Sequence, residues 1–207
     1  MRYFAVLVAL PQLKPSVYSS RLVERPGELL VRPLYEPLLT PIFGRGFFVL
    51  CQDGVAQTVI FDYLDKTKYY WSLLEAGDVE ALRREETMIE RNMQRLVDEE
   101  HITFNGRRVK PRVLCAKISC DLPGRVSFVF SIRWPLSLRR GENVYENVYE
   151  PEEAEYSYQV IWYLPRKARN VRSNFGVPVE LRRGNVLLFY VKRGYRTPGR
   201  EELRFEL

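Results

Sequence analysis

Residues 125–134 read RVSFVFSIRW and residues 155–164 read EYSYQVIWYL, and both stretches alternate apolar and polar side chains. A period of two is typical of a β-strand that buries one face. In the first stretch Val126, Phe128, Phe130, Ile132 and Trp134 share a face. The matching residues of the second stretch are Tyr156, Tyr158, Val160, Trp162 and Leu164. The two stretches therefore predict strands that contribute a large, aromatic-rich face to one core.

Strand patterns continue on both sides of these two stretches. Hairpin turns are predicted at Asn105-Gly106 and at residues 183–185, because Asn and Gly tolerate a positive φ. The final residues, LRFEL, predict one more short strand. Further strands are predicted at 2–10, 27–35, 46–52, 56–64 and 67–74, with a turn or irregular loop at 43–46. Many short strands separated by turn residues favour a sandwich or a barrel.

One segment has the periodicity of a helix, at about residues 78–98. Asp78 is the expected N-cap, because its carboxylate can accept from the first free amides. The expected buried stripe consists of Val79, Leu82, Ile89, Met93 and Leu96. Glu86 falls within this stripe, and we interpret it as an edge residue that reaches water or an arginine such as Arg83.

These patterns predict a mainly β protein of the α+β class. We expect an antiparallel β-sandwich or distorted barrel with one prominent amphipathic helix. The expected parts are an N-terminal β-rich part at 1–76, a connecting helix at 77–100 and an antiparallel β domain at 101–207. A single compact unit is the alternative.

The composition, with 46% apolar and 28% charged residues in 207, excludes a disordered or fibrous chain. No apolar run approaches the roughly 18 residues that span a bilayer, and we read 2–10 as a buried strand rather than an export signal. We therefore expect a cytoplasmic protein without a membrane partner. Arginine outnumbers lysine 25 to 7, which is typical of heat-adapted proteins and also of GC-rich coding.

The sequence offers little for metal or cofactor chemistry. His101 is the single histidine, and Cys51, Cys115 and Cys120 form no metal-binding spacing. We interpret the cysteines as small buried thiols in strands. No Gly-rich phosphate loop is present. We therefore predict no metal site and no cofactor.

The repeat ENVYENVYE at 142–150 places a glutamate at every fourth residue. Val and Tyr between the glutamates favour an extended chain, and Pro151 disfavours a helix. We interpret 142–155 as an exposed strand or hairpin arm with an acidic edge. An acidic strip that binds a partner and a metal site are the alternatives.

Charge is distributed in blocks. Residues 101–141 carry a net charge of +8, residues 142–155 carry −6, and residues 156–207 carry +7. Either the basic blocks share a surface that binds phosphate, or the blocks neutralise one another across neighbouring strands. Because the acidic block lies between two basic ones, internal pairing is the simpler interpretation.

The densest basic stretch is PRKARNVRSNFG at 165–176, which we expect to be a loop. Arg166, Lys167, Arg169 and Arg172 are its candidate residues for binding an anion or a protein partner. A solvated surface loop is the simpler alternative.

These observations favour a non-enzymatic binding or interaction module with an anionic partner, either nucleic acid or an acidic protein surface. One alternative is a metal-dependent hydrolase or nuclease that uses carboxylates such as Asp62 and Asp65. A second alternative is a self-associating structural protein, which includes a homo-oligomer.

Overall fold

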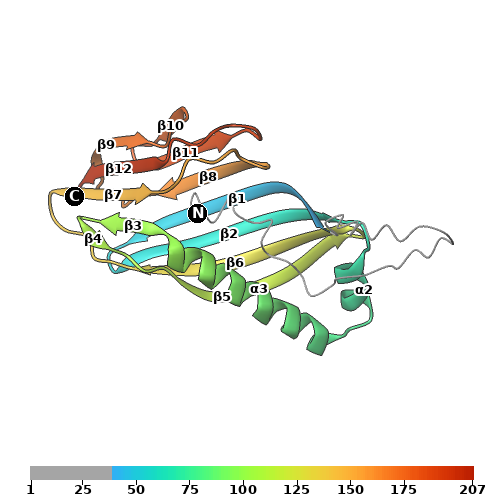
Figure 1. Cartoon of the computed structure of the whole chain (residues 1–207). Coiled ribbons are helices and arrows are strands. Elements are labelled where there is room, and N and C mark those ends of the chain that lie inside the picture. The colour runs from blue at the N-terminus through green and yellow to red at the C-terminus, as the bar shows by residue number, and fades with distance from the viewer. Residues whose placement is uncertain (1–38) are drawn as a thin grey trace.

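The computed structural model describes residues 39–207, which form twelve strands and two helices. The predicted strands at 2–10 and 27–35 lie outside the described residues. Figure 1 shows the arrangement. The elements are β1 (Leu39–Cys51), β2 (Gly54–Asp65), α2 (Tyr69–Glu75), α3 (Val79–Glu99), β3 (His101–Phe104), β4 (Arg107–Arg108), β5 (Arg112–Leu122), β6 (Arg125–Pro135), β7 (Glu142–Val148), β8 (Ser157–Tyr163), β9 (Arg169–Asn174), β10 (Val179–Arg182), β11 (Val186–Val191) and β12 (Arg200–Glu206).

The strands form two sheets. The large sheet has seven strands in the order β10-β11-β8-β1-β2-β6-β5, and the small sheet has five in the order β4-β3-β7-β12-β9. Neighbouring strands are antiparallel except β1 and β8, which run parallel. Neither sheet closes into a barrel, so the mainly β, sandwich-like α+β expectation is confirmed in its sandwich form.

The two stretches that predicted the core lie in or next to the large sheet. All ten apolar residues that the alternation placed on the core face, from β6 and from residues 156–164, are buried. Trp162 stacks on Phe48 of β1 at 4.2 Å between ring centroids. The inner face of the small sheet covers this region, because Tyr145 of β7 contacts Trp134 at 5.8 Å and Trp162 at 5.0 Å.

Helix α3 packs along β5, the edge strand of the large sheet. Asp78 accepts from the Ala81 amide at 2.9 Å, as an N-cap does. Two side chains of α3 also satisfy amides of the strand. Gln94 accepts from Val113 N at 2.8 Å, and Glu86 accepts from Ile118 N at 3.3 Å. The helix therefore covers an edge that would otherwise be open to pairing with another chain.

The predicted stripe of α3 is correct only in part. Ile89, Met93 and Leu96 are buried, whereas Val79 is 54% exposed because it precedes the part of the helix that contacts β5. Glu86 lies at the stripe edge, and its partner is Lys117 of β5 at 2.8 Å rather than Arg83.

Three local predictions are wrong. Residues 67–74 contain α2 instead of a strand, because Asp65 accepts from Thr67 N and Tyr70 N and so starts a helical turn. Residues 43–46 belong to β1, where Gly44 and Gly46 pair with residues of β2. The cysteines are not buried as predicted: Cys115 is exposed, and Cys51 and Cys120 are half-buried.

Strands that precede and follow α3 share one sheet: β1 and β2 lie between β8 and β6. The predicted division at residues 76 and 100 would separate β1 and β2 from β6 and β8 of the same sheet. We therefore describe residues 39–207 as one unit. Neither helix of this unit has the length and apolar character that crossing a bilayer requires.

Candidate anion-binding surface

The four predicted binding residues lie where the chain passes from the large sheet to the small sheet. Arg166 and Lys167 occupy a turn in which Ala168 N donates to Pro165 O at 2.9 Å. Arg169 and Arg172 lie in β9, so the expectation of a loop through 165–176 is wrong for residues 169–174. These residues form a strand because their backbone pairs with β12. All four side chains are exposed.

Turns from distant parts of the sequence meet at this end of the small sheet. Glu206 of β12 stands opposite both Glu142 of β7 and Arg169 of β9. Asn105 N donates to Val144 O at 2.8 Å, which brings the β3–β4 turn to the start of β7. In Figure 1 this end carries the C-terminus. We call the exposed cations of these turns the turn-end cluster: Arg107, Arg139, Arg140, Arg166, Lys167 and Arg169.

Two asparagines hold the turns of this cluster in place. Asn143, which has no exposed surface, donates to Arg139 O at 2.8 Å and to Gly141 O at 3.1 Å, and it accepts from Arg139 N at 3.0 Å. Asn105 donates to the Asn143 side chain at 3.2 Å and accepts from Val144 N at 2.9 Å. Buried polar groups that satisfy one another in this way fix the backbone that carries the cations.

The first two glutamates of the acidic block bind arginines of β12. Residues 142–148 form β7, a strand as predicted, whereas residues 149–155 follow it as an irregular segment with one bridge from Glu153 to Arg196. Glu142 and Glu146 face Arg204 and Arg200 of β12 on the outer face of the small sheet. Arg204 also binds Glu202, with 2.6 Å between Nε and Oε1. This hydrogen bond lowers the pKa of the Glu202 carboxyl and raises the pKa of the Arg204 guanidinium. We call this set of charges the β7–β12 ladder.

Within residues 39–207, no cation of the turn-end cluster forms an ion pair. The guanidinium of Arg139 donates to the backbone oxygen of Glu142 at 2.8 Å, which leaves its charge uncompensated. Arg172 also lacks an ion pair there, and it stands opposite Arg204, a cation already bound to Glu202 and Glu142. The basic block at 156–207 therefore divides into a neutralised part on β12 and a part that exposes free charge.

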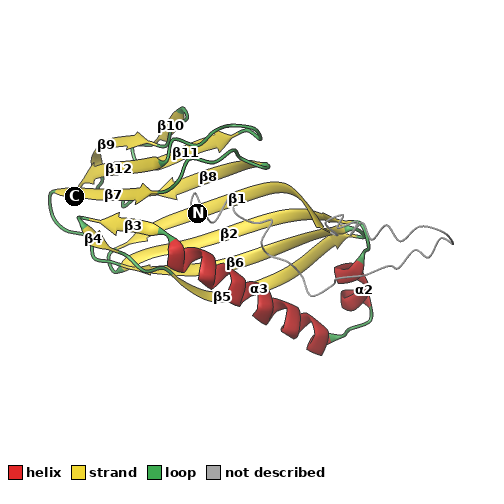
Figure 2. Cartoon of the chain, in the orientation of Figure 1, coloured by secondary structure: helices red, strands yellow, loops and turns green. Residues whose placement is uncertain are grey.

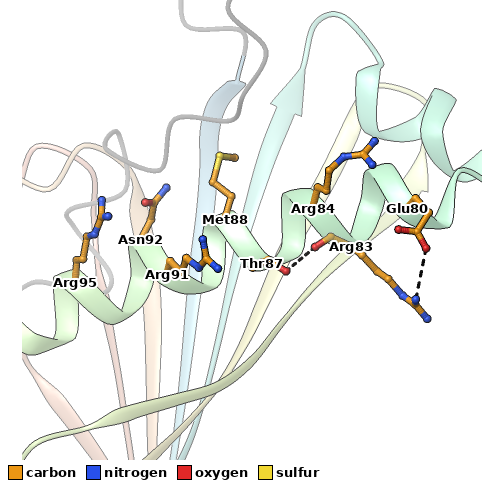
Figure 3. Close-up of a pocket in the computed structure, with 8 residues that line it drawn as sticks. All are labelled: Glu80, Arg83, Arg84, Thr87, Met88, Arg91, Asn92 and Arg95. Carbon is orange, nitrogen blue, oxygen red and sulfur yellow. Dashed lines mark hydrogen bonds and ion pairs between the residues drawn. The ribbon is translucent and has the colours of Figure 1, made fainter.

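A second cationic surface was not predicted. Arg84, Arg91 and Arg95 lie within one face of α3, because spacings of seven and four match the helical period. They line a pocket along the helix together with Met88 and Asn92 (Figure 3). The net negative charge of residues 77–100 concealed this row, which the helical spacing of the arginines alone would have revealed.

The structure does not bring the two candidate catalytic acids together. Asp62 and Asp65 lie three residues apart on β2 and thus point to opposite faces. Asp62 binds Arg45 and accepts from Ser127 Oγ at 2.6 Å. Asp65 accepts from Thr67 and Tyr70 at the start of α2. Among the described residues no group of three His, Cys, Asp or Glu side chains is placed to hold a metal ion.

The fold and this surface define a two-sheet, mainly β protein with a cationic end. No protein-family model matches the sequence, and no curated relative matches it. Its fold is weakly similar to that of yeast LTA4 hydrolase bound to bestatin, with a TM-score of 0.37 and 8% identity over 90% of this chain and 32% of that chain. The similarity to native leukotriene A4 hydrolase from Saccharomyces cerevisiae has a TM-score of 0.33 and 7% identity, over 81% of this chain and 29% of that chain. The chain thus spans about a third of the length of these proteins, and scores this low support no argument about function.

Proposed function

We propose that this chain is a non-enzymatic binding module that recognises an anionic partner through the turn-end cluster and Arg172. One observation supports the proposal most directly: Glu142 and Glu146 bind Arg204 and Arg200 of β12, and within residues 39–207 the cluster cations have no ion pair. Exposed cations that lie close together produce a positive potential that attracts polyanions.

Nucleic acid is the partner that this cluster fits best. Five of its six cations are arginines, and a guanidinium can bind two phosphate oxygens at once. The cations lie on β4, before β7, and from residue 166 into β9, so they are distributed across one end of the small sheet, where they could contact successive phosphates. An acidic protein surface is the competing partner.

The test is the salt dependence of binding to a fluorescent single-stranded oligonucleotide. The variant Arg166→Gln/Lys167→Gln/Arg169→Gln removes three charges from the cluster. The control Lys192→Gln/Arg193→Gln/Arg196→Gln removes the same residue types, all exposed, beyond the opposite end of β11. The cluster variant is expected to bind more weakly and to reduce the slope of log K against log salt by about two, because each single-strand phosphate contact contributes about 0.7, whereas the control keeps its slope.

Three outcomes distinguish the possibilities. Equal losses of oligonucleotide affinity in both variants would indicate non-specific electrostatic binding and would contradict the assignment to this cluster. No oligonucleotide binding at low salt, together with cluster-dependent binding of polyglutamate, would assign the surface to an acidic protein. Binding to neither polymer would overturn the proposed function.

A further inference from the structure

One flank of α3 carries a row of three arginines. The helix packs along β5 (Figure 2), and this contact uses only part of its circumference. Arg84, Arg91 and Arg95 lie within about 40° of one another around the helix axis, because an α-helix has about 3.6 residues per turn. All three side chains are exposed, and none forms an ion pair within residues 39–207. We call them the α3 row.

The acids nearest to the middle of α3 point away from this row and have partners there. Glu85 is buried and accepts from the Tyr70 hydroxyl of α2 at 3.2 Å. Glu86 binds Lys117 of β5, with 2.8 Å between Oε2 and Nζ. Residues 77–100 are net negative in sequence, yet the flank that carries the α3 row is positive.

The α3 row lines a pocket of about 500 Å³, a volume within the usual range of small-molecule sites. Met88 and Asn92, both half-buried, lie along the same stretch of helix between Arg84 and Arg95 (Figure 3). Glu80 is the one carboxylate among the described lining residues, and it binds Arg83 at 3.7 Å. The described lining therefore offers guanidinium and amide donors and has a net charge of +3, from four arginines and one glutamate.

The arrangement of the row is costly without an anion. Arg91 and Arg95 are four residues apart, and like charges at this spacing destabilise a helix. An anion bound between them would remove this repulsion. A guanidinium binds two phosphate oxygens at once, so phosphate is the anion that matches these side chains best.

We propose that the pocket along α3 binds a small ligand with several phosphate groups in line. Arg84 and Arg95 are eleven residues apart, which is about 16 Å along the axis at about 1.5 Å per residue, so one phosphate contacts only part of the row. A chain of phosphates is able to contact all of it. The inference is independent of the proposed function, because no residue of the turn-end cluster is among the described residues that line the pocket.

The test is isothermal titration calorimetry of the chain with inorganic tripolyphosphate at low salt. The variant Arg84→Gln/Arg91→Gln/Arg95→Gln removes the α3 row. It is expected to raise the dissociation constant about a hundredfold or more, because it removes charge-assisted hydrogen bonds. The cluster variant is the matched control, because it removes three exposed cations from a different surface, and it should keep its affinity. Wild type should bind inorganic phosphate more weakly than tripolyphosphate.

A second variant keeps the test valid if the triple variant does not fold, which circular dichroism shows. Glutamine is a good helix former, so we expect the triple variant to fold. Arg91→Glu places a carboxylate four residues before Arg95, a spacing that stabilises a helix, and reverses the charge in the middle of the row. This variant should fold and should lose tripolyphosphate binding.

Each remaining outcome decides the inference. Tighter binding of ATP than of tripolyphosphate, lost in the same variants, would support it and identify a nucleoside triphosphate as the ligand. No tripolyphosphate binding by wild type would overturn it, and so would equal losses in the row and cluster variants. Weaker oligonucleotide binding in the row variants, with tripolyphosphate binding unchanged, would assign the row to nucleic acid and reject the small ligand.

Discussion

The β7–β12 ladder and the turn-end cluster both contain arginines in neighbouring strands and turns, but the arginines of the ladder form ion pairs and the cations of the cluster form none within residues 39–207. In the ladder each arginine lies within reach of a glutamate on the adjacent strand. In the cluster the cations lie on turns and at the ends of β4 and β9, and none of them forms an ion pair within residues 39–207, although Glu206 stands opposite Arg169. Neutralisation of the acidic block therefore depends on the register between β7 and β12.

The largest expected effect comes from removing the buried side chain that connects the two regions. Asn143→Ala removes the hydrogen bonds of this buried side chain to Arg139 N, Arg139 O and Gly141 O and should lower the free energy of unfolding by about 2–4 kcal/mol. Urea denaturation measures this change. The control is Asn147→Ala in the same strand, because the Oδ1 atom of this buried asparagine has no hydrogen-bond partner. An equal loss in both variants would contradict the special role of Asn143.

A smaller effect, of opposite sign, is expected on the inner face of β12. Glu201 is buried, and burial, together with the nearby Glu100, raises the pKa of its carboxyl well above the usual range. Because the folded pKa is raised, the stability associated with this group is complete below the unfolded pKa of about 4.5 and decreases as the pH rises through the folded pKa. Glu201→Gln should therefore stabilise the protein at pH 7 by about 1–3 kcal/mol.

Melting curves at several pH values test this prediction. The gain should disappear at a pH below the unfolded pKa, where Glu201 is protonated in both states. A gain that is independent of pH would mean that the ionisation of Glu201 is not its cause. Glu202→Gln is the matched control on the outer face of the small sheet. It should not stabilise the protein, because Glu202 binds Arg204.

The smallest expected effect distinguishes the roles of Arg204 and Arg172, which stand opposite each other on β12 and β9. Arg204→Ala should raise the pKa of Glu202 toward its ordinary value and lower the melting temperature slightly, because exposed ion pairs contribute little. The pKa of Glu202 is depressed in the folded state, so this loss is present at neutral pH and disappears as the pH falls through that pKa. NMR titration of the Glu202 carboxyl measures the shift.

Arg172→Ala is the control for this experiment. It removes a cation that has no ion pair among residues 39–207, so the melting temperature and the pKa of Glu202 should remain unchanged. Equal shifts in both variants would show that Arg172 also belongs to the ladder and that the two regions do not differ.

Local patterns in the sequence predicted much of the fold and little of the surface. The alternation in β6 and β8 identified the core residues, and Asn105-Gly106 identified a hairpin turn. The sequence also predicted that 142–150 is extended. It did not show that Asn143 is buried, because its distant partner Asn105 is brought to it only by the pairing of β3 with β7. The strand at 169–174 was missed for the same reason, since its polar residues have no strand pattern of their own.

The sequence by itself determined the class of fold, the strand-forming segments, the capped helix and the block distribution of charge. Each of these follows from periodicity or turn chemistry within a few residues. Only the tertiary structure decided which charges are paired: it placed β12 beside β7, and within residues 39–207 it left Arg166, Lys167 and Arg169 without an ion pair. The physical reason is that ion pairing and burial depend on register between strands distant in the chain, which local sequence does not encode.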